Sequence, residues 1–325
     1  MNTTDALPVL ATLALPPALL EAARAKGLEL LGPLHQTDPA AFATRADGIA
    51  AVLASADAVV DAALMDQLPN LRLVSVIGVG YDGVDVAAAR TRGVAVTHTP
   101  GVLDDDVADL ALGLMLAVAR QIPAADRFVR EGRWPQGPMP VARRLSGARC
   151  GLVGMGRIGQ AIAQRAAAFQ MEIAYTARGP KSDLPYAFVP DVRALAGRSD
   201  VLVVVTPGGA ATRHLIGADV LRALGPQGVL VNVARGSVVD EAALIEALEQ
   251  GLIAGAGLDV FEDEPHVPER LRALPNAVLT PHVGSATAQT RQAMAGLALG
   301  NLVALRQGLP LLTPVPECRA GAAVC

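Results

Sequence analysis

The sequence predicts an α/β fold built from parallel sheets, and three observations carry this prediction. Short apolar runs rich in Val, Ile and Leu alternate with helical patterns along nearly the whole chain. These runs are continuously apolar, as in strands that helices cover on both faces of a sheet. A glycine-rich turn that leads from such a run into a helix occurs twice. We therefore expect two Rossmann-like domains with parallel sheets.

Eight apolar runs are the predicted strands. In chain order they are LRLVSVIG (71–78), VAVTH (94–98), RCGLVG (149–154), MEIAYT (171–176), DVLVVVT (200–206), GVLVNV (228–233), LIAGAGLDV (252–260) and AVLTPH (277–282). Most neighbouring runs are separated by a stretch long enough for a crossover helix, which parallel neighbours require.

Two longer helical patterns set the domain boundaries. One runs from about Leu103 to Arg120, and the other from about Ser285 to Gln307. If they flank one contiguous domain, that domain spans 99–283. The remaining segments, 1–98 and 284–325, then form a second domain that is discontinuous in sequence. The acidic residues Asp104, Asp105 and Asp106 begin the first helix, where the helix dipole favours anions, and we do not expect a metal site there.

Composition limits the classes of partner. The chain has 325 residues, of which 52% are hydrophobic and 18% charged, and its net charge is −4. This balance disfavours nucleic acid and anionic membranes and leaves small molecules as the expected ligands.

No apolar run reaches the roughly 18 residues of a membrane span, and the N-terminal segment does not resemble a signal peptide. Three cysteines without metal-like spacing fit a reducing compartment, so we expect a cytoplasmic protein; the last residues, ECRAGAAVC, resemble a frayed tail.

The two glycine motifs differ in the length of the helical pattern after them. GMGRIG, with Gly154, Gly156 and Gly159, precedes about three helical turns, which suits a Rossmann crossover whose N-terminus faces a pyrophosphate. GVGYDG, at 78–83, precedes only about two turns. We assign GMGRIG to a dinucleotide. GVGYDG is a tight turn, a cradle in which the backbone N–H groups of Val79 and Gly80 hold a carboxylate, or both.

The stretch TARGPK, at 176–181, indicates which dinucleotide is bound. In a Rossmann fold the second strand ordinarily ends in an acid that accepts hydrogen bonds from the ribose hydroxyls. Here Arg178 occupies that place, with Lys181 close by. A guanidinium cannot accept these bonds, but it can form a fork onto a 2′-phosphate. The sequence therefore favours NADP(H) over NAD(H), unless Arg178 is simply a solvated loop residue.

Three polar residues follow predicted strands at the edge where α/β proteins bind ligands. They are Arg235 after GVLVNV, Glu264 after LIAGAGLDV and His282 after AVLT. Together they suit reduction of a 2-oxo acid: the imidazole donates a proton, the carboxylate orients it, and the guanidinium holds the substrate carboxylate and polarises the oxo group. Singly, each also has a structural explanation: a turn, a solvent-facing acid and a core histidine.

The sequence resembles the D-isomer-specific 2-hydroxyacid dehydrogenases over nearly its whole length. The resemblance rests on six motifs in the family's order: GVGYDGVDV, HTPGVLDDDVADLALGLMLAVAR, GLVGMGRIGQAIA, VNVARGSVVDEAAL, GAGLDVFEDEP and PHVGSAT. It is strongest toward the NADPH-preferring hydroxypyruvate, glyoxylate and hydroxyphenylpyruvate reductases.

The resemblance implies roles for individual residues. The catalytic trio is Arg235, Glu264 and His282. The cofactor-binding residues implied are Gly154, Met155, Gly156, Arg157, Ile158, Gly159, Ala177, Arg178, Gly179, Thr206, Val233 and Asp259. The substrate-binding residues implied are Leu53, Val79 and Gly80 together with Arg235 and His282. Two departures from the family stand out: Ala177 replaces a polar residue before Arg178, and Asp104 replaces a commoner threonine.

The implied activity is NADPH-dependent reduction of small 2-oxo acids, hydroxypyruvate or glyoxylate, to D-2-hydroxy acids. The alternatives are a reductase of aryl 2-oxo acids of the hydroxyphenylpyruvate type and, in a different class, a dinucleotide-sensing protein resembling a corepressor. The resemblance also implies a homodimer. Trp134, the only tryptophan, is then either an interface anchor or a residue that reaches the partner's cleft.

Overall fold

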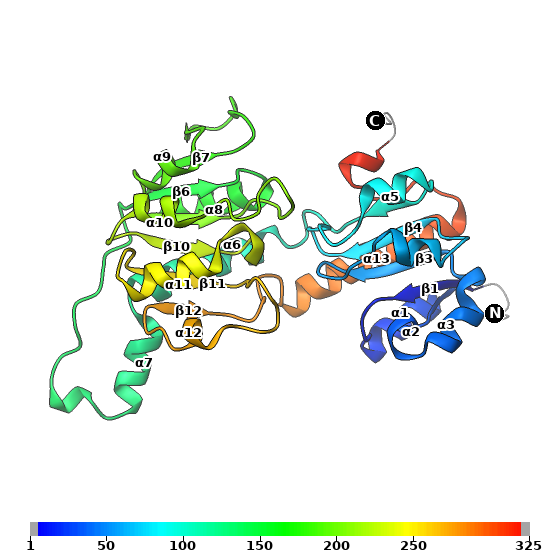
Figure 1. Ribbon diagram of the computed structural model, residues 1–325, viewed down its shortest axis with the longest axis horizontal. Helices are drawn as coiled ribbons and strands as arrows, with labels where there is room; N and C mark the ends of the chain where they lie inside the picture. Colours follow the sequence, from blue (N-terminus) through cyan, green and yellow to red (C-terminus); the bar gives the residue numbers. More distant parts are fainter. Residues whose placement is uncertain (1–5, 320–325) are drawn as a thin grey trace. The chain divides into compact units, whose positions relative to one another are not determined.

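The computed structural model describes residues 6–319, and its chain forms two compact units (Figure 1). Unit 1 comprises residues 1–103 and 287–325, and unit 2 comprises residues 104–286. The division by contacts thus falls at 103/104 and 286/287, close to the 98/99 and 283/284 proposed from the two helical patterns. Residues 320–325, most of the segment predicted to be a frayed tail, lie outside the described part of the chain.

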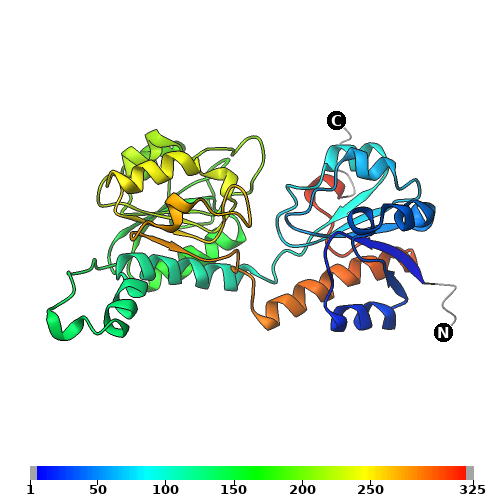
Figure 2. The same ribbon diagram turned by 60° about the horizontal axis from the view of Figure 1, so that its bottom comes forward.

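Unit 1 is built on a five-stranded parallel sheet with the strand order β2-β1-β3-β4-β5. The strands are β1 (Leu7–Ala11), β2 (Leu28–Leu30), β3 (Ala51–Ser55), β4 (Leu73–Ile77) and β5 (Ala95–Thr97). Its helices are α1 (Pro17–Ala25), α2 (Leu34–Thr37), α3 (Pro39–Arg45), α4 (Ala62–Asp66), α5 (Val86–Thr91) and α13 (Ala288–Gln307), with short 3-10 turns at Ala46–Gly48 and Pro316–Cys318. The long helix α13, orange in Figure 2, packs against β4, so the last part of the chain completes the domain that the first part begins.

Unit 2 is built on a seven-stranded parallel sheet with the order β12-β11-β10-β9-β6-β7-β8. The strands are β6 (Arg149–Val153), β7 (Glu172–Thr176), β8 (Ala187–Phe188), β9 (Val201–Val204), β10 (Val229–Asn232), β11 (Gly255–Leu258) and β12 (Ala277–Leu279). The chain moves outward from β6 through β7 to β8 and then returns to β9 on the other side of β6. This reversal is the topological switch point at which doubly wound sheets bind ligands.

Helices cover both faces of this sheet. They are α6 (Asp104–Ala119), α7 (Ile122–Arg130), α8 (Arg157–Ala168), α9 (Val192–Ala196), α10 (Ala218–Leu224), α11 (Glu241–Glu249) and α12 (Glu269–Arg272), with 3-10 turns η3 (Trp134–Gln136) and η4 (Gly236–Val238). The helices α6 and α8 pack side by side, and α10 packs between α9 and α11. Because both faces are covered, every residue of β9, β10 and β11 is buried.

The eight predicted strands and both long helices are confirmed, each with its ends shifted by a few residues. The acidic start of α6 is also confirmed. Asp105 and Asp109 of this helix both pair with Arg165 of α8, which joins the two neighbouring helices. The strands β1, β2, β3 and β8 were not predicted. β2 and β8 are only three and two residues long, and β1 (LPVLA) and β3 (AVLAS) contain Pro or Ala, which are depleted in strands.

No single helix within residues 6–319 is long and apolar enough to cross a membrane. The pair α6 and α7, bent by 59°, meets the criteria of length and composition alone. However, α6 is a core helix of unit 2, since Ala108, Ala111 and Met115 are fully buried.

Leu152 gives a test of this core. Its side chain is 0% exposed in β6, between β7 and β9. We expect Leu152→Ala to lower the free energy of unfolding by about 2–5 kcal/mol, because the substitution leaves a cavity that neighbouring strands cannot fill. Chemical denaturation followed by circular dichroism measures the change. The matched control is Val141→Ala, whose side chain is 96% exposed and should change stability by less than about 0.5 kcal/mol. Equal losses in both variants would contradict this account of the sheet.

Candidate active site

Each glycine of GMGRIG has a different structural role. Gly154 has a φ of +111°, a conformation that other residues rarely adopt, and its N–H continues the strand by bonding to the Thr176 carbonyl. A Cβ on Gly159 would collide with the carbonyl oxygen of Gly154, so the helix lies directly on the turn. A Cβ on Gly156, by contrast, would meet nothing within 4 Å. The turn is therefore open at Gly156, beside the N-terminus of α8, which is the geometry that admits a pyrophosphate.

The other glycine motif has a different structure. In GVGYDG the helix α5 begins only at Val86, beyond the motif, and is six residues long. Cβ atoms on Gly78 and Gly83 would collide with Ala56 and with the Ala58 carbonyl. These glycines allow close packing of two loops of unit 1, which is the tight-turn interpretation. The Val79 carbonyl also contacts Nδ1 of His98 at 2.9 Å.

Arg178 lies two residues beyond the end of β7, next to β6 and its glycine turn. Its side chain is exposed, and the loop after it is fixed by a hydrogen bond of 2.7 Å from the Lys181 backbone N–H to the hydroxyl of Tyr175, a buried residue of β7. No acid stands at 176–178. The end of β7 thus presents a cation and no side-chain carboxylate that could accept a hydrogen bond.

Three loops bring the proposed catalytic residues to the carboxyl edge of the same sheet. Arg235 follows β10, Glu264 follows β11, and His282 follows β12. These three strands are parallel neighbours in register, so their loops emerge side by side. All three residues therefore belong to unit 2, and their arrangement is set within it.

The Arg235 loop is fixed by Asn232 and Gly236. The side chain of Asn232, buried at the end of β10, donates to the Arg235 carbonyl at 2.9 Å and accepts from the Ala234 N–H at 3.0 Å. A Cβ on Gly236 would overlap the backbone of Phe261 and Glu262. Only glycine allows the loop with Arg235 to lie against the loop that carries Glu264.

Glu264 and His282 form a direct pair. The distance from Oε2 of Glu264 to Nδ1 of His282 is 2.7 Å, while Oε1 accepts from the Phe261 N–H at 3.0 Å. Burial alone would raise the pKa of Glu264. The hydrogen bonds from His282 and Phe261, with the positive charges of His282 and Arg235, outweigh burial and hold that pKa below its usual value. Glu264 is therefore a carboxylate, so Nδ1 must carry the hydrogen of this bond, and Nε2 is left to face a ligand.

The same pair favours the charged imidazole. The hydrogen bond to Glu264 raises the pKa of His282 above 6.5, burial opposes it, and the charges of Glu264 and Asp259 support the increase. The nearby charge of Arg235 acts in the opposite direction. Since Arg235 influences the pKa values of both Glu264 and His282, the three charged groups act within one electrostatic site.

Asp259 holds the backbone that presents His282. Its side chain is 2% exposed and accepts hydrogen bonds from the hydroxyl of Thr280 at 2.6 Å and from the N–H groups of Val283 and Gly284, both at 2.8 Å. His282 itself has a φ of +52°, a conformation unusual for a histidine, and its N–H bonds to the Asp259 carbonyl. The buried carboxylate thus fixes the turn from both sides of His282.

A further carboxylate, which the sequence did not point to, holds the loop that carries Glu264. Oε1 of Glu262 contacts Nη2 of Arg213 and Nε2 of His214, both at 2.9 Å, and the Glu262 N–H donates to Glu241. These bonds tie the loop of Glu264 to the loop that begins after β9 with Thr206. The acids of EDEP therefore have different roles, which their spacing alone does not reveal.

The remaining predicted site residues differ in burial. Met155 and Val233 are buried at the ends of β6 and β10, and Thr206 follows β9 with partial exposure. Leu53 is fully buried in β3, so its side chain belongs to the core of unit 1. This burial gives no support to the substrate contact predicted for Leu53. Val79 and Gly80 are partly exposed at the end of β4.

The glycine turn at the switch point and the acid–base pair at the same edge define the class of this protein: a dinucleotide-dependent oxidoreductase with a Rossmann domain. A family model described as "D-isomer specific 2-hydroxyacid dehydrogenase, NAD binding domain" matches residues 112–284. The chain belongs to this family of 2-hydroxyacid dehydrogenases.

Known relatives extend over most of the chain. It is 50% identical to hydroxyphenylpyruvate reductase of Plectranthus scutellarioides over 84% of this chain and 88% of that protein. It is also 50% identical to glyoxylate/hydroxypyruvate reductase A of Arabidopsis thaliana, over 84% and 87%. A solved structure of an NADPH-dependent glyoxylate/hydroxypyruvate reductase from Sinorhizobium meliloti, with NADP and malonate, has a TM-score of 0.90 and 44% identity, covering 96% of this chain and 99% of that one.

Replacing Glu264 by Gln tests the charge pairing. The substitution removes the negative charge that raises the pKa of His282, while burial and the charge of Arg235 remain, so that pKa should fall. An NMR titration of the His282 ring measures it. Asp263→Asn, next to Glu264 in the same loop and 87% exposed, is the control and should leave the titration of His282 nearly unchanged. An unchanged His282 pKa in the Glu264 variant would contradict the pairing.

Proposed function

We propose that this protein reduces small 2-oxo acids, glyoxylate and hydroxypyruvate, to D-2-hydroxy acids with NADPH. The observation that carries the proposal is the gathering of Arg235, Glu264 and His282 at the sheet edge that also holds the glycine turn. The relatives named as glyoxylate/hydroxypyruvate reductases support the choice of substrates.

In the proposed reaction, the three charged residues of the trio have different roles. A bound reduced nicotinamide supplies the hydride that the carbonyl carbon of the substrate accepts. Arg235 offers a fork of N–H groups to the substrate carboxylate and polarises the oxo group. His282 donates a proton from Nε2 to the oxygen on which negative charge develops. Glu264 keeps the imidazole oriented and protonated, because its carboxylate stabilises the cation.

The chain offers a fitting site for the cofactor. The open turn at Gly156, the left-handed Gly154 and the close contact of Gly159 suit a pyrophosphate at the N-terminus of α8. Arg157, Ile158, Ala177 and Gly179 line the same turn and the end of β7, as expected for cofactor contacts. We assign the 2′-phosphate to Arg178, with Lys181 nearby, and hence a preference for NADP(H) over NAD(H).

A second substrate class has specific support. The relative named hydroxyphenylpyruvate reductase is as similar as the glyoxylate/hydroxypyruvate reductase, which favours an aryl 2-oxo acid as the alternative. A corepressor-like binding protein is disfavoured because the trio is complete and is paired as catalysis requires.

We also propose a homodimer in the cytoplasm. The segment from α7 through η3 extends from the body of unit 2 in both views (Figure 1 and Figure 2). It exposes Ile122, Val129 and Trp134, the last at 69%. Large exposed apolar side chains on one segment favour a protein interface, and we propose Trp134 as its anchor or as a residue that reaches the partner's cleft.

The decisive experiment is a panel of 2-oxo acids assayed side by side with NADPH and NADH. Turnover should be fastest with glyoxylate or hydroxypyruvate and NADPH. Faster turnover of hydroxyphenylpyruvate would select the alternative substrate class. Absence of turnover with every acid would overturn the proposed function.

Arg178→Gln should lower kcat/KM for NADPH by about 10- to 100-fold and leave the value for NADH nearly unchanged. The reason is the loss of charge-assisted hydrogen bonds to the 2′-phosphate, each worth about 1.5–3 kcal/mol. Steady-state kinetics with both cofactors measures the effect. Arg193→Gln, an exposed arginine of α9, is the control. Equal losses with both cofactors would show that Arg178 does not read the phosphate.

Arg235→Gln should lower kcat/KM for the 2-oxo acid by about 100- to 1000-fold, in line with loss of one donor at a developing oxyanion. Binding of NADPH, measured by fluorescence titration, should be nearly unaffected. An Arg235→Gln variant that retains full turnover would remove Arg235 from the mechanism.

The rate of reduction by the wild-type enzyme should fall as pH rises past the pKa of His282, since reduction needs the protonated imidazole.

A further inference from the structure

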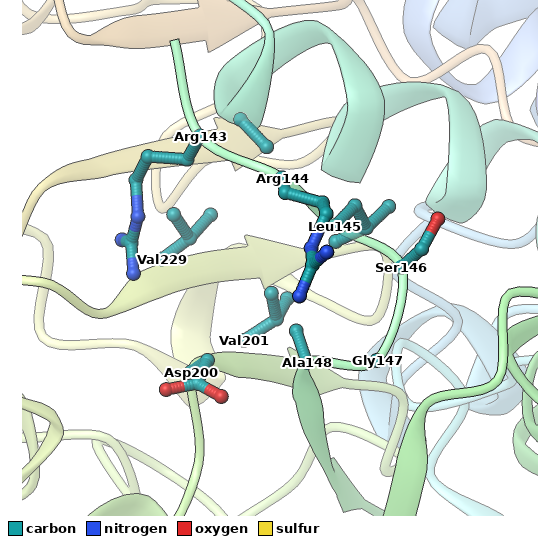
Figure 3. A pocket seen from close by; sticks show the side chains of 10 residues that line it. Arg143, Arg144, Leu145, Ser146, Gly147, Ala148, Asp200, Val201 and Val229 are labelled. Atoms are coloured by element: carbon teal, nitrogen blue, oxygen red, sulfur yellow. The ribbon is translucent and has the colours of Figure 1, made fainter.

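A charged pocket lies at the edge of the seven-stranded sheet opposite the edge that carries Arg235, Glu264 and His282. It has a volume of about 230 Å³ and is lined where β6, β9 and β10 begin, by Ala119, the loop 143–148, Asp200, Val201 and Val229 (Figure 3). The strands of this sheet are parallel, so their amino ends lie here and their carboxyl ends carry the catalytic trio. The pocket is therefore separate from the site proposed for catalysis.

Two arginines give the pocket a positive charge. Arg143 and Arg144 lie side by side in the chain, and Figure 3 shows both guanidinium groups directed to the same side of their loop, toward Val201, Val229 and Asp200. Within residues 6–319, neither side chain has a hydrogen bond or an ion pair at contact distance. The backbone of Arg143 is fixed by a bond of 3.0 Å from its N–H to the Ala119 carbonyl, which holds the loop against the end of α6.

The one acid in the pocket is already engaged. Asp200 accepts hydrogen bonds from the N–H and Nε of Arg149 through one oxygen, at 2.8 and 3.1 Å, and from Nη2 through the other, at 2.8 Å. The hydrogen bonds from Arg149 lower the pKa of Asp200 despite its partial burial, and the charges of Arg149 and Arg143 add to this effect, so the acid is ionised and is paired with Arg149. The charges of Arg143 and Arg144 therefore remain in excess in the pocket.

One nitrogen of Arg143 indicates the chemistry of the ligand. Its Nη1 is buried and has no hydrogen-bond partner in the described part of the chain. A buried N–H group of a cation without a partner costs about 1–3 kcal/mol or more, a cost that a negatively charged acceptor removes. The missing partner of Nη1 and the surplus charge thus call for the same ligand chemistry.

We propose that this pocket binds a small oxyanion between Arg143 and Arg144. Its volume is below the range of about 300–1000 Å³ typical of sites for larger organic ligands, which favours inorganic phosphate or a short dicarboxylate over a nucleotide. The two guanidinium forks on the lining match the oxygen atoms of such an anion.

Binding of inorganic phosphate and of malonate to the full-length protein tests the proposal. Isothermal titration calorimetry is carried out with saturating NADPH, so that the cofactor site, including Arg178, is not available to the probe. All proteins compared also carry Arg235→Gln, so that the proposed substrate site does not hold the anion. Protein with Arg143 and Arg144 intact should bind one anion per chain. Arg143→Gln/Arg144→Gln should weaken this binding at least about tenfold, since it removes two charged donors. Preference for phosphate or for malonate then identifies the source of the oxyanion.

Three controls keep the test specific. Arg198→Gln removes an exposed arginine that precedes β9 but does not line the pocket, and it should bind the anion as the protein with Arg143 and Arg144 intact does. Arg143→Lys/Arg144→Lys should restore part of the affinity. Arg178→Gln should have no effect, so failure of the cofactor assignment does not affect this result. Equal binding by the protein with both arginines intact and the double Gln variant would overturn the proposal. It would also be overturned if no anion bound and the variant changed the oligomeric state, because an acid of a second copy would then occupy the pocket.

Discussion

The parallel register of β10, β11 and β12 is the constraint on which the rest of the site depends. Each strand ends at the same edge of the sheet, so the residues after it must emerge within reach of the next loop. A guanidinium, a carboxylate and an imidazole separated widely along the chain thereby become neighbours. Two local features sharpen this placement: the absence of a side chain at Gly236, and the buried carboxylate of Asp259 that holds the turn of His282.

The charges at this edge are balanced against one another. The hydrogen bond between Glu264 and His282 favours the ionised form of both partners, whereas Arg235 opposes protonation of the histidine and supports ionisation of the glutamate. A site with only the acid and the imidazole would be nearly neutral and would attract no anion. In the proposed function, the arginine adds the positive charge that attracts a 2-oxo acid. Glu264 outweighs the effect of that charge on His282, whose pKa stays above 6.5.

Arginine supplies the cation in several ion pairs of this chain and in the anion sites that we propose. Lys+Arg number 27 in the sequence, yet the net charge is −4, so its cations are not a general basic surface. Some arginines join elements, as Arg165 joins α6 and α8 and Arg149 joins the starts of β6 and β9. Others, at 178 and 235, stand at strand ends on the carboxyl edge, and a further pair stands at the amino edge. The planar fork of donors suits each of these places better than a lysine would.

The sequence by itself determined the fold class, eight strands and the two bounding helices, and it suggested the trio that we propose for catalysis. Continuous apolar runs and glycine spacing are local signals, and each residue proposed for catalysis comes shortly after such a run. Only the tertiary structure revealed β1, β2, β3 and β8, whose short or Ala- and Pro-containing segments carry a weak local signal and form strands because neighbouring strands pair with them. It also separated Glu264 from Glu262, which are two residues apart but contact His282 and His214 respectively. Leu53 illustrates the same limit, since the resemblance suggested a ligand contact and the packing of β3 made it core. Hydrogen-bond partners are chosen by distance in space, and a sequence records only the order of residues along the chain.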